Sequence, residues 1–280
     1  MVTTVTSING RLVERKDARI SVFDNSLLYA EGLFETLLVI DDRLVFAGEH
    51  LRRLYRGARI IGLDIPVSPE KLTRWMIKTV QAHPDRITKL RLTVTSGEAA
   101  RWVGRQGKPQ IVLSASPHQM PTKPFRLHVS EFKVDQKSIF RRIKTISYAI
   151  HAAALKQARQ KDCDDALLLN QNHQVAEVTS ANLYWVRNGR VFTPPIGSGC
   201  LEGITRKIVL REARKLDHAI TEKDASLNRL LDADEVFISS SLKLVVGVSH
   251  IRVGRRNHSF PSGPITGMFS EHFHRLVHLN

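Results

Sequence analysis

The sequence predicts a protein of mixed α and β structure built as two domains. Three observations indicate this: tight-turn dipeptides separate short apolar runs, apolar residues recur elsewhere at helical spacing, and a proline-rich stretch divides the chain near its middle. Of the 280 residues, 42% are hydrophobic and 25% are charged, which is typical of globular proteins and argues against disorder. A chain of this length is sufficient for one large or two ordinary domains.

The first part of the chain has the pattern of hairpins and amphipathic helices. Asn9-Gly10 lies between two apolar runs and predicts a β-hairpin, because this dipeptide favours the tight turn that suits twisted strands. Leu51, Leu54 and Ala58 follow helical spacing, and Pro69 suits the first turn of a second helix. We expect strands over residues 36–40, 43–46, 89–95 and 110–114, and helices over 49–61 and 70–82.

The stretch PHQMPTKP, residues 117–124, has three prolines in eight positions and is the predicted linker between the domains. The expected limits are a small N-terminal domain over 1–117, a linker over 118–126 and a larger domain over 127–280. Asn188-Gly189 predicts another hairpin in the second domain. Further strands are expected over 126–131, 165–169, 182–186, 190–192, 235–239 and 244–248, and helices after residue 144 and over 205–216.

Composition limits the functional classes. The N-terminus MVTTVTSING has no basic stretch followed by an apolar core, and no apolar run approaches the roughly 20 residues of a membrane helix. Cys163 and Cys200 lack metal-ligand spacing, so we expect no metal site and a cytoplasmic protein. The 42 Lys and Arg against 27 Asp and Glu give a net charge of +15, which indicates a basic solvated surface or an attraction for anionic ligands.

Lys144 stands between a basic run and an alanine-rich helix pattern in FRRIKTISYAIHAAALKQA, residues 140–158. A lysine reacts near neutral pH only when desolvation or cationic neighbours favour its neutral form. Arg141 and Arg142 are nearby in sequence, but they can equally point elsewhere. From this segment alone, Lys144 is either a nucleophile or an ordinary solvent-facing lysine.

Four other segments carry candidate ligand-binding groups, each with an ordinary alternative. Glu177 interrupts an apolar strand pattern and, if buried, requires a cationic or donor partner, although strand-end carboxylates are usually turn residues. Gly203, Ile204 and Thr205 open a helix whose free N–H groups suit a phosphate, although Thr205 also suits a simple N-cap. SSSL (residues 239–242) and Arg53 in HLRRL also suit phosphate binding. The ordinary alternatives are a polar loop for SSSL and a surface arginine for Arg53.

These segments, in this order, resemble the class IV aminotransferases, the fold-type IV enzymes that use pyridoxal 5′-phosphate (PLP). The resemblance covers nearly the whole chain and is carried by ISVFDNSLLYAEGLFETL, HLRRLYRGARIIGLDIP, IKTISY, AEVTSANLYWV, TPPIGSGCLEGITR and ADEVFISSSL. It implies a smaller N-terminal α/β domain and a larger, barrel-like C-terminal domain of mixed β structure. The chain departs from the family at Ala30-Glu31-Gly32, where Gly-Asp-Gly is usual, and at Gly57, where serine is common.

The resemblance also implies roles for single residues. Lys144 would form the Schiff base with PLP and move the proton, and Glu177 would pair with the ring nitrogen of the cofactor. Tyr148 would lie at the cofactor hydroxyl. The remaining implied contacts are Arg53, Ile204, Thr205, Ser240 and Ser241 at the phosphate, and Tyr29, Phe34, Thr36 and Arg101 at the substrate.

Two activities within this family remain open. A transaminase moves an amino group between an amino acid and an α-keto acid, whereas a 4-amino-4-deoxychorismate lyase eliminates pyruvate, and both need Lys144 and Glu177. Arg101 is compatible with both, and FISSSLKLVVGV is somewhat more lyase-like. The transaminase is preferred because more subfamilies have that activity. The resemblance also implies a homodimer, small amino and keto acid substrates, and no nucleic acid or membrane partner; a basic nucleic-acid-binding protein is the remote alternative.

Overall fold

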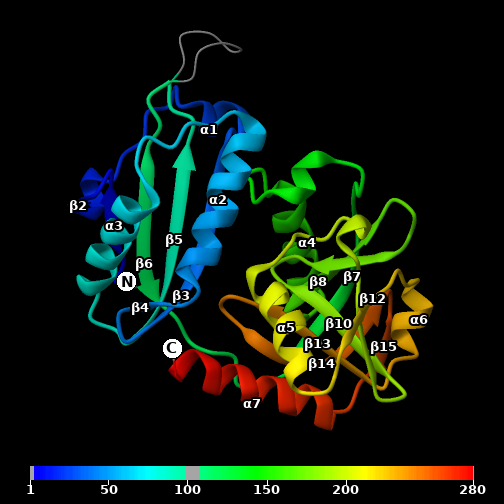
Figure 1. Cartoon of the computed structure of the whole chain (residues 1–280). Helices are drawn as coiled ribbons and strands as arrows, with labels where there is room; N and C mark the ends of the chain where they lie inside the picture. The colour runs from blue at the N-terminus through cyan, green and yellow to red at the C-terminus, as the bar shows by residue number, and fades with distance from the viewer. Residues whose placement is uncertain (1–2, 99–106, 280) are drawn as a thin grey trace. The chain divides into compact units, whose positions relative to one another are not determined.

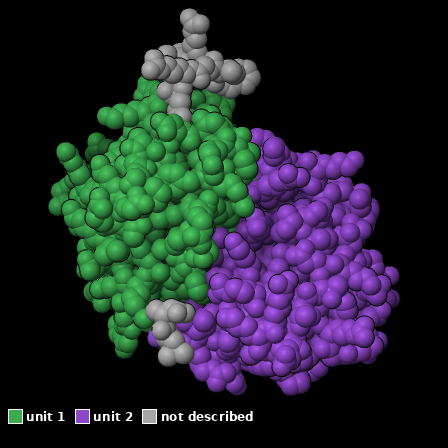
Figure 2. Space-filling view, in the orientation of Figure 1, with its two compact units in different colours: residues 1–119, 143–147 green, residues 120–142, 148–280 purple. Residues whose placement is uncertain are grey.

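The structure, a computed structural model, describes residues 3–98 and 107–279 and divides into two compact units (Figure 2). Unit 1 comprises residues 1–119 and 143–147, and unit 2 comprises residues 120–142 and 148–280. The chain thus returns to unit 1 for one short segment, Ile143–Ser147, which contains Lys144. The domain limits drawn from the proline-rich stretch stay a prediction.

Unit 1 is a six-stranded antiparallel sheet with two longer helices against it (Figure 1). The strand order is β2-β1-β6-β5-β3-β4. The strands are β1 (Val5–Ile8), β2 (Arg11–Val13), β3 (Gly32–Ile40), β4 (Arg43–Leu44), β5 (Ile87–Thr95) and β6 (Ile111–Pro117). The helices are the 3₁₀ turn η1 (Arg15–Asp17), α1 (Asn25–Tyr29), α2 (Ala47–Ile61) and α3 (Pro69–Gln81).

The hairpin predicted from Asn9-Gly10 is confirmed in unit 1, and the strands expected over 36–40 and 43–46 form a second hairpin. Asn9 and Gly10 have φ values of 52° and 81°, so both adopt the left-handed conformation that this tight turn requires. Asp41 and Asp42 form the second turn, with φ values of 48° and 61°. The strand expected over 43–46 ends at Leu44, because Phe46 turns left-handed (φ 54°) and leads into α2.

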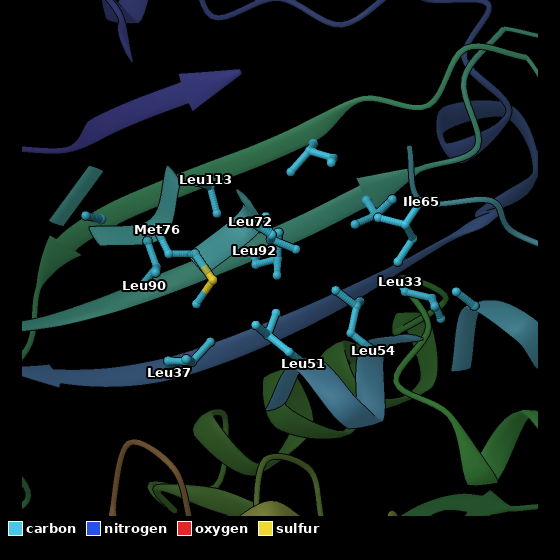
Figure 3. Packing of buried hydrophobic residues seen from close by; sticks show 14 of the residues in the cluster. Leu33, Leu37, Leu51, Leu54, Ile65, Leu72, Met76, Leu90, Leu92 and Leu113 are labelled. Atoms are coloured by element: carbon cyan, nitrogen blue, oxygen red, sulfur yellow. The ribbon is translucent and has the colours of Figure 1, made fainter. Parts of the chain in front are cut away.

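The core of unit 1 lies between the sheet and the two helices (Figure 3). Alternate residues of β3 and β5 point into it, and the helices supply the facing side chains at spacings of three and four. The buried cluster includes Leu33, Leu37, Leu51, Leu54, Leu72, Met76, Leu90, Leu92 and Leu113. The same alternation places Phe34, Thr36 and Arg91 on the opposite face of the sheet.

Unit 2 is built on one nine-stranded mixed sheet of order β12-β11-β10-β13-β14-β7-β8-β9, with β15 paired to β14. The end strand β9 comes back beside β10 at the Val178–Ala181 bridge, so the sheet curls into a barrel-like form. The strands are β7 (Phe125–Val134), β8 (Asp165–Asn170), β9 (Val175–Val178), β10 (Asn182–Arg187), β11 (Arg190–Thr193), β12 (Ile220–Glu222), β13 (Glu235–Ser240), β14 (Leu244–Val253) and β15 (Arg256–Ser259).

The helices of unit 2 are short apart from three. They are η2 (Ile139–Arg142), α4 (Ala149–Arg159), η3 (Ile196–Ser198), α5 (Ile204–Lys215), α6 (Leu227–Leu231) and α7 (Pro264–Leu279). The predicted mixture of α and β structure and the barrel-like second part are confirmed. Within residues 3–98 and 107–279, no helix combines the length and the apolar character needed to cross a membrane.

Candidate active site

Lys144 is fixed by backbone pairing to the first residues of β3. The Phe34 N–H donates to the Lys144 carbonyl at 3.0 Å, and the Ile146 N–H donates to the Gly32 carbonyl at 3.0 Å. Leu33 and Thr145 form a bridge between these two bonds. The Lys144 Nζ lies 4.4 Å from the centroid of the Phe34 ring. Two residues singled out from the sequence are therefore neighbours, and the lysine is held by the sheet.

Arg91 is a second cation on the same ring, and sequence reasoning missed it. Its guanidinium carbon lies 4.0 Å from the Phe34 ring centroid, and the residue is opposite Thr36 in the β3–β5 register. The strand alternation of β5 alone indicates which face Arg91 occupies. Only the pairing with β3 shows that this face also carries Phe34 and, through it, Lys144.

Arg53 is a buried member of an ion-pair network in unit 1, so the surface-arginine alternative is wrong. Its Nε donates to Glu35 Oε1 at 2.8 Å and its Nη2 donates to Glu35 Oε2 at 2.6 Å, a bidentate pair. The Nδ1 of His50 is 2.6 Å from Glu35 Oε2. All three side chains are at most 7% exposed.

The electrostatics of this network favour an ionised carboxylate and a neutral imidazole. Burial alone would raise the pKa of Glu35, but the charge and hydrogen bonds of Arg53, with His50, hold it at about 2. Burial lowers the pKa of His50; Glu35 opposes that shift, while the charges of Arg53 and Lys144 add to it. Lys144 is therefore close enough to this network for its charge to be felt there.

In unit 2, Glu177 lies on β9 and is only 4% exposed. Its Oε1 accepts from Arg141 Nη2 and lies 3.1 Å from His151 Nε2, and its Oε2 accepts from the Leu201 N–H at 2.8 Å. Burial would raise its pKa, but the charge of Arg141 and the bonds from His151 and Leu201 hold the pKa at about 2. Glu177 is thus a buried, ionised carboxylate and not a turn residue.

The segment after Leu201 leads directly into α5. The helix N-cap is Gly203, which has no side chain to cap it, and Thr205 is inside the first turn. The N-cap alternative for Thr205 is therefore wrong. Its Oγ1 is buried and has no hydrogen-bond partner within the described residues. An unsatisfied hydroxyl of this kind is unusual in a folded protein, and here it stands at the positive end of a helix.

Asn182 joins this helix start to the sheet. Its Nδ2 donates to the Leu201 carbonyl at 2.8 Å, and its Oδ1 stands 2.0 Å from the place a Cβ on Gly203 would occupy. Asn182 also pairs with Ser239 between β10 and β13. The helix start and the end of β13 are therefore neighbours, and the buried Ser240 Oγ at that end likewise has no partner in the described part of the chain. Ser241 follows in the turn and is partly buried.

The remaining predicted residues are placed less centrally or lie outside the described residues. Tyr148 is the N-cap residue of α4 and stacks on His151, with ring centroids 4.2 Å apart. Tyr29 is 51% exposed at the end of α1. Arg101 falls in residues 99–106, which the structure does not describe. No group of three or more His, Cys, Asp or Glu side chains that suits a metal ion is found among the described residues.

Comparison with known proteins connects this arrangement to one family. A family model described as "Amino-transferase class IV" matches residues 32–251. A protein of Methanocaldococcus jannaschii, assigned by its name to the branched-chain-amino-acid aminotransferases, is 32% identical over 95% of this chain and 94% of its own. A D-alanine aminotransferase of Bacillus licheniformis is 31% identical over 92% of each chain.

Solved structures show the same fold. The branched-chain aminotransferase of the thermophilic archaeon Thermoproteus uzoniensis, determined with norvaline, superposes with a TM-score of 0.90 at 27% identity, covering 98% of this chain and 94% of its own. A structure from Legionella pneumophila, named for 4-amino-4-deoxychorismate lyase, gives a TM-score of 0.87 at 25% identity and covers 93% and 96% of the two chains.

Proposed function

This chain belongs to the class IV aminotransferases, and from that premise we propose that it moves an amino group between an amino acid and an α-keto acid with PLP as cofactor. Enzymes of this family depend on PLP, and structural neighbours are bound to PLP derivatives. When bound, the cofactor supplies an electron sink for the carbanion that forms at the substrate Cα.

The observation that carries the proposal is the Leu201 segment. Its N–H bonds to the ionised Glu177, and its carbonyl accepts from Asn182, which packs against the start of α5. The segment around Leu201 thereby fixes a buried carboxylate, Glu177, and the N-terminal end of a helix, α5, which is suited to an anion. PLP needs a partner for a protonated ring nitrogen at one end and an anion site for its phosphate at the other.

The residues fit the cofactor at both ends. We assign the phosphate to the Ile204 and Thr205 N–H groups, with the unpartnered hydroxyls of Thr205 and Ser240 as further donors. Ser241 completes that assignment, and Tyr148 is assigned to the cofactor hydroxyl. Arg53 stays a predicted phosphate residue. Glu177 would hold the proton at the ring nitrogen.

Lys144 is assigned the covalent attachment of the cofactor and the movement of the Cα proton. Its backbone bonds to Phe34 and Gly32 support this role, because they fix the position of the amine at the start of β3. Phe34 and Thr36, which share their sheet face with Arg91, are proposed to contact the substrate. Tyr29 and Arg101 stay predicted substrate residues.

We also propose that the chain works as a homodimer. Val22, Phe23, Leu27 and Leu28 are 51–66% exposed over a single short segment of unit 1, which is typical of a surface that another chain covers. Sedimentation equilibrium tests this: a monomer at micromolar concentration would contradict it. A cytoplasmic location stays a prediction.

The lyase remains the second candidate because a lyase-named structure matches nearly the whole chain. The deciding experiment is visible absorption spectroscopy of the protein with PLP, before and after adding D-amino acids, L-amino acids or aminodeoxychorismate. Lys144→Ala should lose the band of the lysine-bound cofactor. Lys137→Ala, which changes an exposed lysine in the same part of the chain, should keep it.

Each outcome has a clear meaning. If an amino acid removes the band and a keto acid restores it, the protein is a transaminase, and the enantiomer that reacts defines its class. Turnover of aminodeoxychorismate alone, with release of pyruvate, would instead establish the lyase. No band in the wild-type protein would contradict both.

A further inference from the structure

The two oxygens of Glu177 are used unequally. Oε1 is contacted by both Arg141 and His151, whereas Oε2 accepts only the Leu201 N–H within the described residues. A carboxylate has about four acceptor positions, two on each oxygen. The protein therefore saturates one oxygen and leaves an acceptor position on the other.

Two hydrogen bonds hold Arg141 at this carboxylate. Its Nε donates to the Gly199 carbonyl at 2.7 Å, which fixes the guanidinium while Nη2 reaches Glu177 Oε1. The Arg141 side chain is 18% exposed. The neighbouring Arg142 is exposed and makes no such contact in the described structure. The two arginines that precede Lys144 thus have different environments.

His151 is the second partner of the same oxygen. Its Nε2 is 3.1 Å from Oε1, which can only accept, and 3.4 Å from Arg141 Nη1, which can only donate; we assign the hydrogen to Nε2 because the carboxylate oxygen is nearer and charged. The ring is 5% exposed and stacks on Tyr148. These contacts fix the imidazole plane, and through it the direction in which Oε2 presents its open position.

We propose that Arg141 and His151 are positioning residues for Glu177. Their contacts to Oε1 keep the carboxylate ionised and leave Oε2 to accept a hydrogen bond from the protonated ring nitrogen of the cofactor. This inference rests on the proposed function. It adds that two further side chains, Arg141 and His151, would set the charge and orientation of the carboxylate that meets the ring nitrogen. The carboxylate is charged before the cofactor arrives, so binding requires no ionisation step.

The pH dependence follows from the groups that face Glu177, namely Arg141, His151 and the buried thiol of Cys200. With Arg141 present, the pKa of Glu177 is about 2, so the carboxylate stays ionised at every working pH. Without Arg141, the largest remaining influence is burial, which raises the pKa of Glu177, and the Cys200 thiol stays neutral because its own pKa is raised to about 12. An Arg141→Gln variant should therefore protonate Glu177 as the pH falls, and lose the contact to the ring nitrogen.

The experiment compares the dissociation constants of PLP and 1-deaza-PLP, which has a carbon in place of the ring nitrogen. Both carry the same phosphate and aldehyde, so the ratio of the two constants isolates the ring-nitrogen contact. In the wild type we expect PLP to be preferred by ~10- to 100-fold, the usual value of a charged hydrogen bond. That preference should change less than about 2-fold between pH 5 and pH 8, because Glu177 remains ionised.

The variants separate the two arginines. Arg141→Gln should prefer PLP over 1-deaza-PLP as strongly as the wild type at pH 8, but ~10-fold less strongly at pH 5. Arg142→Gln should show the wild-type preference at both pH values. Arg141→Lys, which retains the charge, should restore the pH-independent preference. His151→Phe, which retains the stacking on Tyr148, should lower the preference and keeps the test valid if Arg141→Gln does not fold.

The proposal is overturned if Arg141→Gln prefers PLP over 1-deaza-PLP as strongly as the wild type at both pH 5 and pH 8. If Arg141→Gln does not fold, the same result in His151→Phe overturns it. The proposal is also overturned if the wild type binds PLP and 1-deaza-PLP equally tightly, because Glu177 would then not contact the ring nitrogen. Failure of the proposed function is a different result: the wild type would take up neither compound.

Discussion

Thr205 carries the most direct information on the cofactor at the scale of single residues. A buried hydroxyl without a partner costs stability, and replacement by a methyl group of the same shape is close to neutral or stabilising. Thr205→Val should therefore change the free energy of unfolding without cofactor by less than about 0.5 kcal/mol, yet raise the dissociation constant of PLP by ~10-fold through loss of a phosphate donor. Urea unfolding and a PLP titration measure the two effects.

Thr88 offers a matched control for that substitution. Its Oγ1 is also buried without a partner in the described chain, but it lies near the start of β5 in unit 1, opposite Val39, and is not among the assigned cofactor residues. Thr88→Val should leave PLP binding unchanged. A large stability loss in Thr205→Val without cofactor would show that the hydroxyl is structural.

Arg91 is the candidate for recognising a second carboxylate on the substrate. It shares the Phe34 ring with Lys144, so its charge lies close to the reacting amine. Arg91→Gln should raise KM at least ~10-fold for a dicarboxylic amino donor, the value of one charge-assisted hydrogen bond, with little change for an aliphatic donor.

Arg86→Gln is the control for Arg91→Gln, because Arg86 is exposed and pairs with Asp41 at the far end of the same strands. Steady-state kinetics with both donors decide the question. Equal increases of KM for both donors would contradict a role in selecting the side chain.

Among the elements, the start of α5 depends on a glycine for reasons of space. A Cβ at Gly203 would lie 2.0 Å from Asn182 Oδ1, so Gly203→Ala must displace Asn182 and weaken its bond to Leu201. We expect a stability loss of about 1–3 kcal/mol and weaker PLP binding, because the helix start shifts relative to β13. Gly197→Ala is the control, since nothing lies within 4 Å of its added Cβ. An unchanged unfolding midpoint in Gly203→Ala would contradict this packing.

Elements with strong local signals were predictable from the sequence. The Asn9-Gly10 and Asn188-Gly189 hairpins form as expected, because their backbone conformation is set by the residues themselves. α2 begins at Ala47 and α3 at Pro69, each within two residues of expectation. The helix α7 and the strand β12 were not predicted: the three residues of β12 give little periodic signal, whereas α7 was missed although Phe269, Phe273 and Val277 follow helical spacing.

The site was only partly predictable because its decisive contacts are long-range. The family motifs led to Lys144, Glu177 and Thr205, but nothing in the local sequence pairs Glu35 with Arg53, which are 18 residues apart. Arg141 and Glu177 are separated by 36 residues and meet only when η2, which carries Arg141, lies beside β9 in unit 2. Strand pairing and burial, not residue type, therefore decide which charges become partners.

At the scale of the whole molecule, each unit contains a deeply buried carboxylate that an arginine holds ionised. Glu35 in unit 1 and Glu177 in unit 2 both have pKa values of about 2 in the folded protein, compared with an ordinary value of 4.5. A lowered folded-state pKa contributes stability that is present above pH 4.5 and is lost as the pH falls towards 2. The difference corresponds to roughly 3 kcal/mol for each carboxylate.

The loss of stability should begin before the carboxylates titrate. Burial keeps His50 neutral in the folded protein, whereas the unfolded chain binds a proton below about pH 6.5, so acid already favours unfolding there. We expect the urea midpoint of the cofactor-free protein to decline gently from pH 6.5 to 4.5 and steeply below it. His50→Asn should reduce the gentle part of the decline, to which His128 also contributes because burial lowers its pKa too. Glu14→Gln, at an exposed ion pair with Lys16, should change neither part. A midpoint that stays constant between pH 5 and pH 3 would contradict this account, because it would mean that neither unit depends on its buried carboxylate being charged.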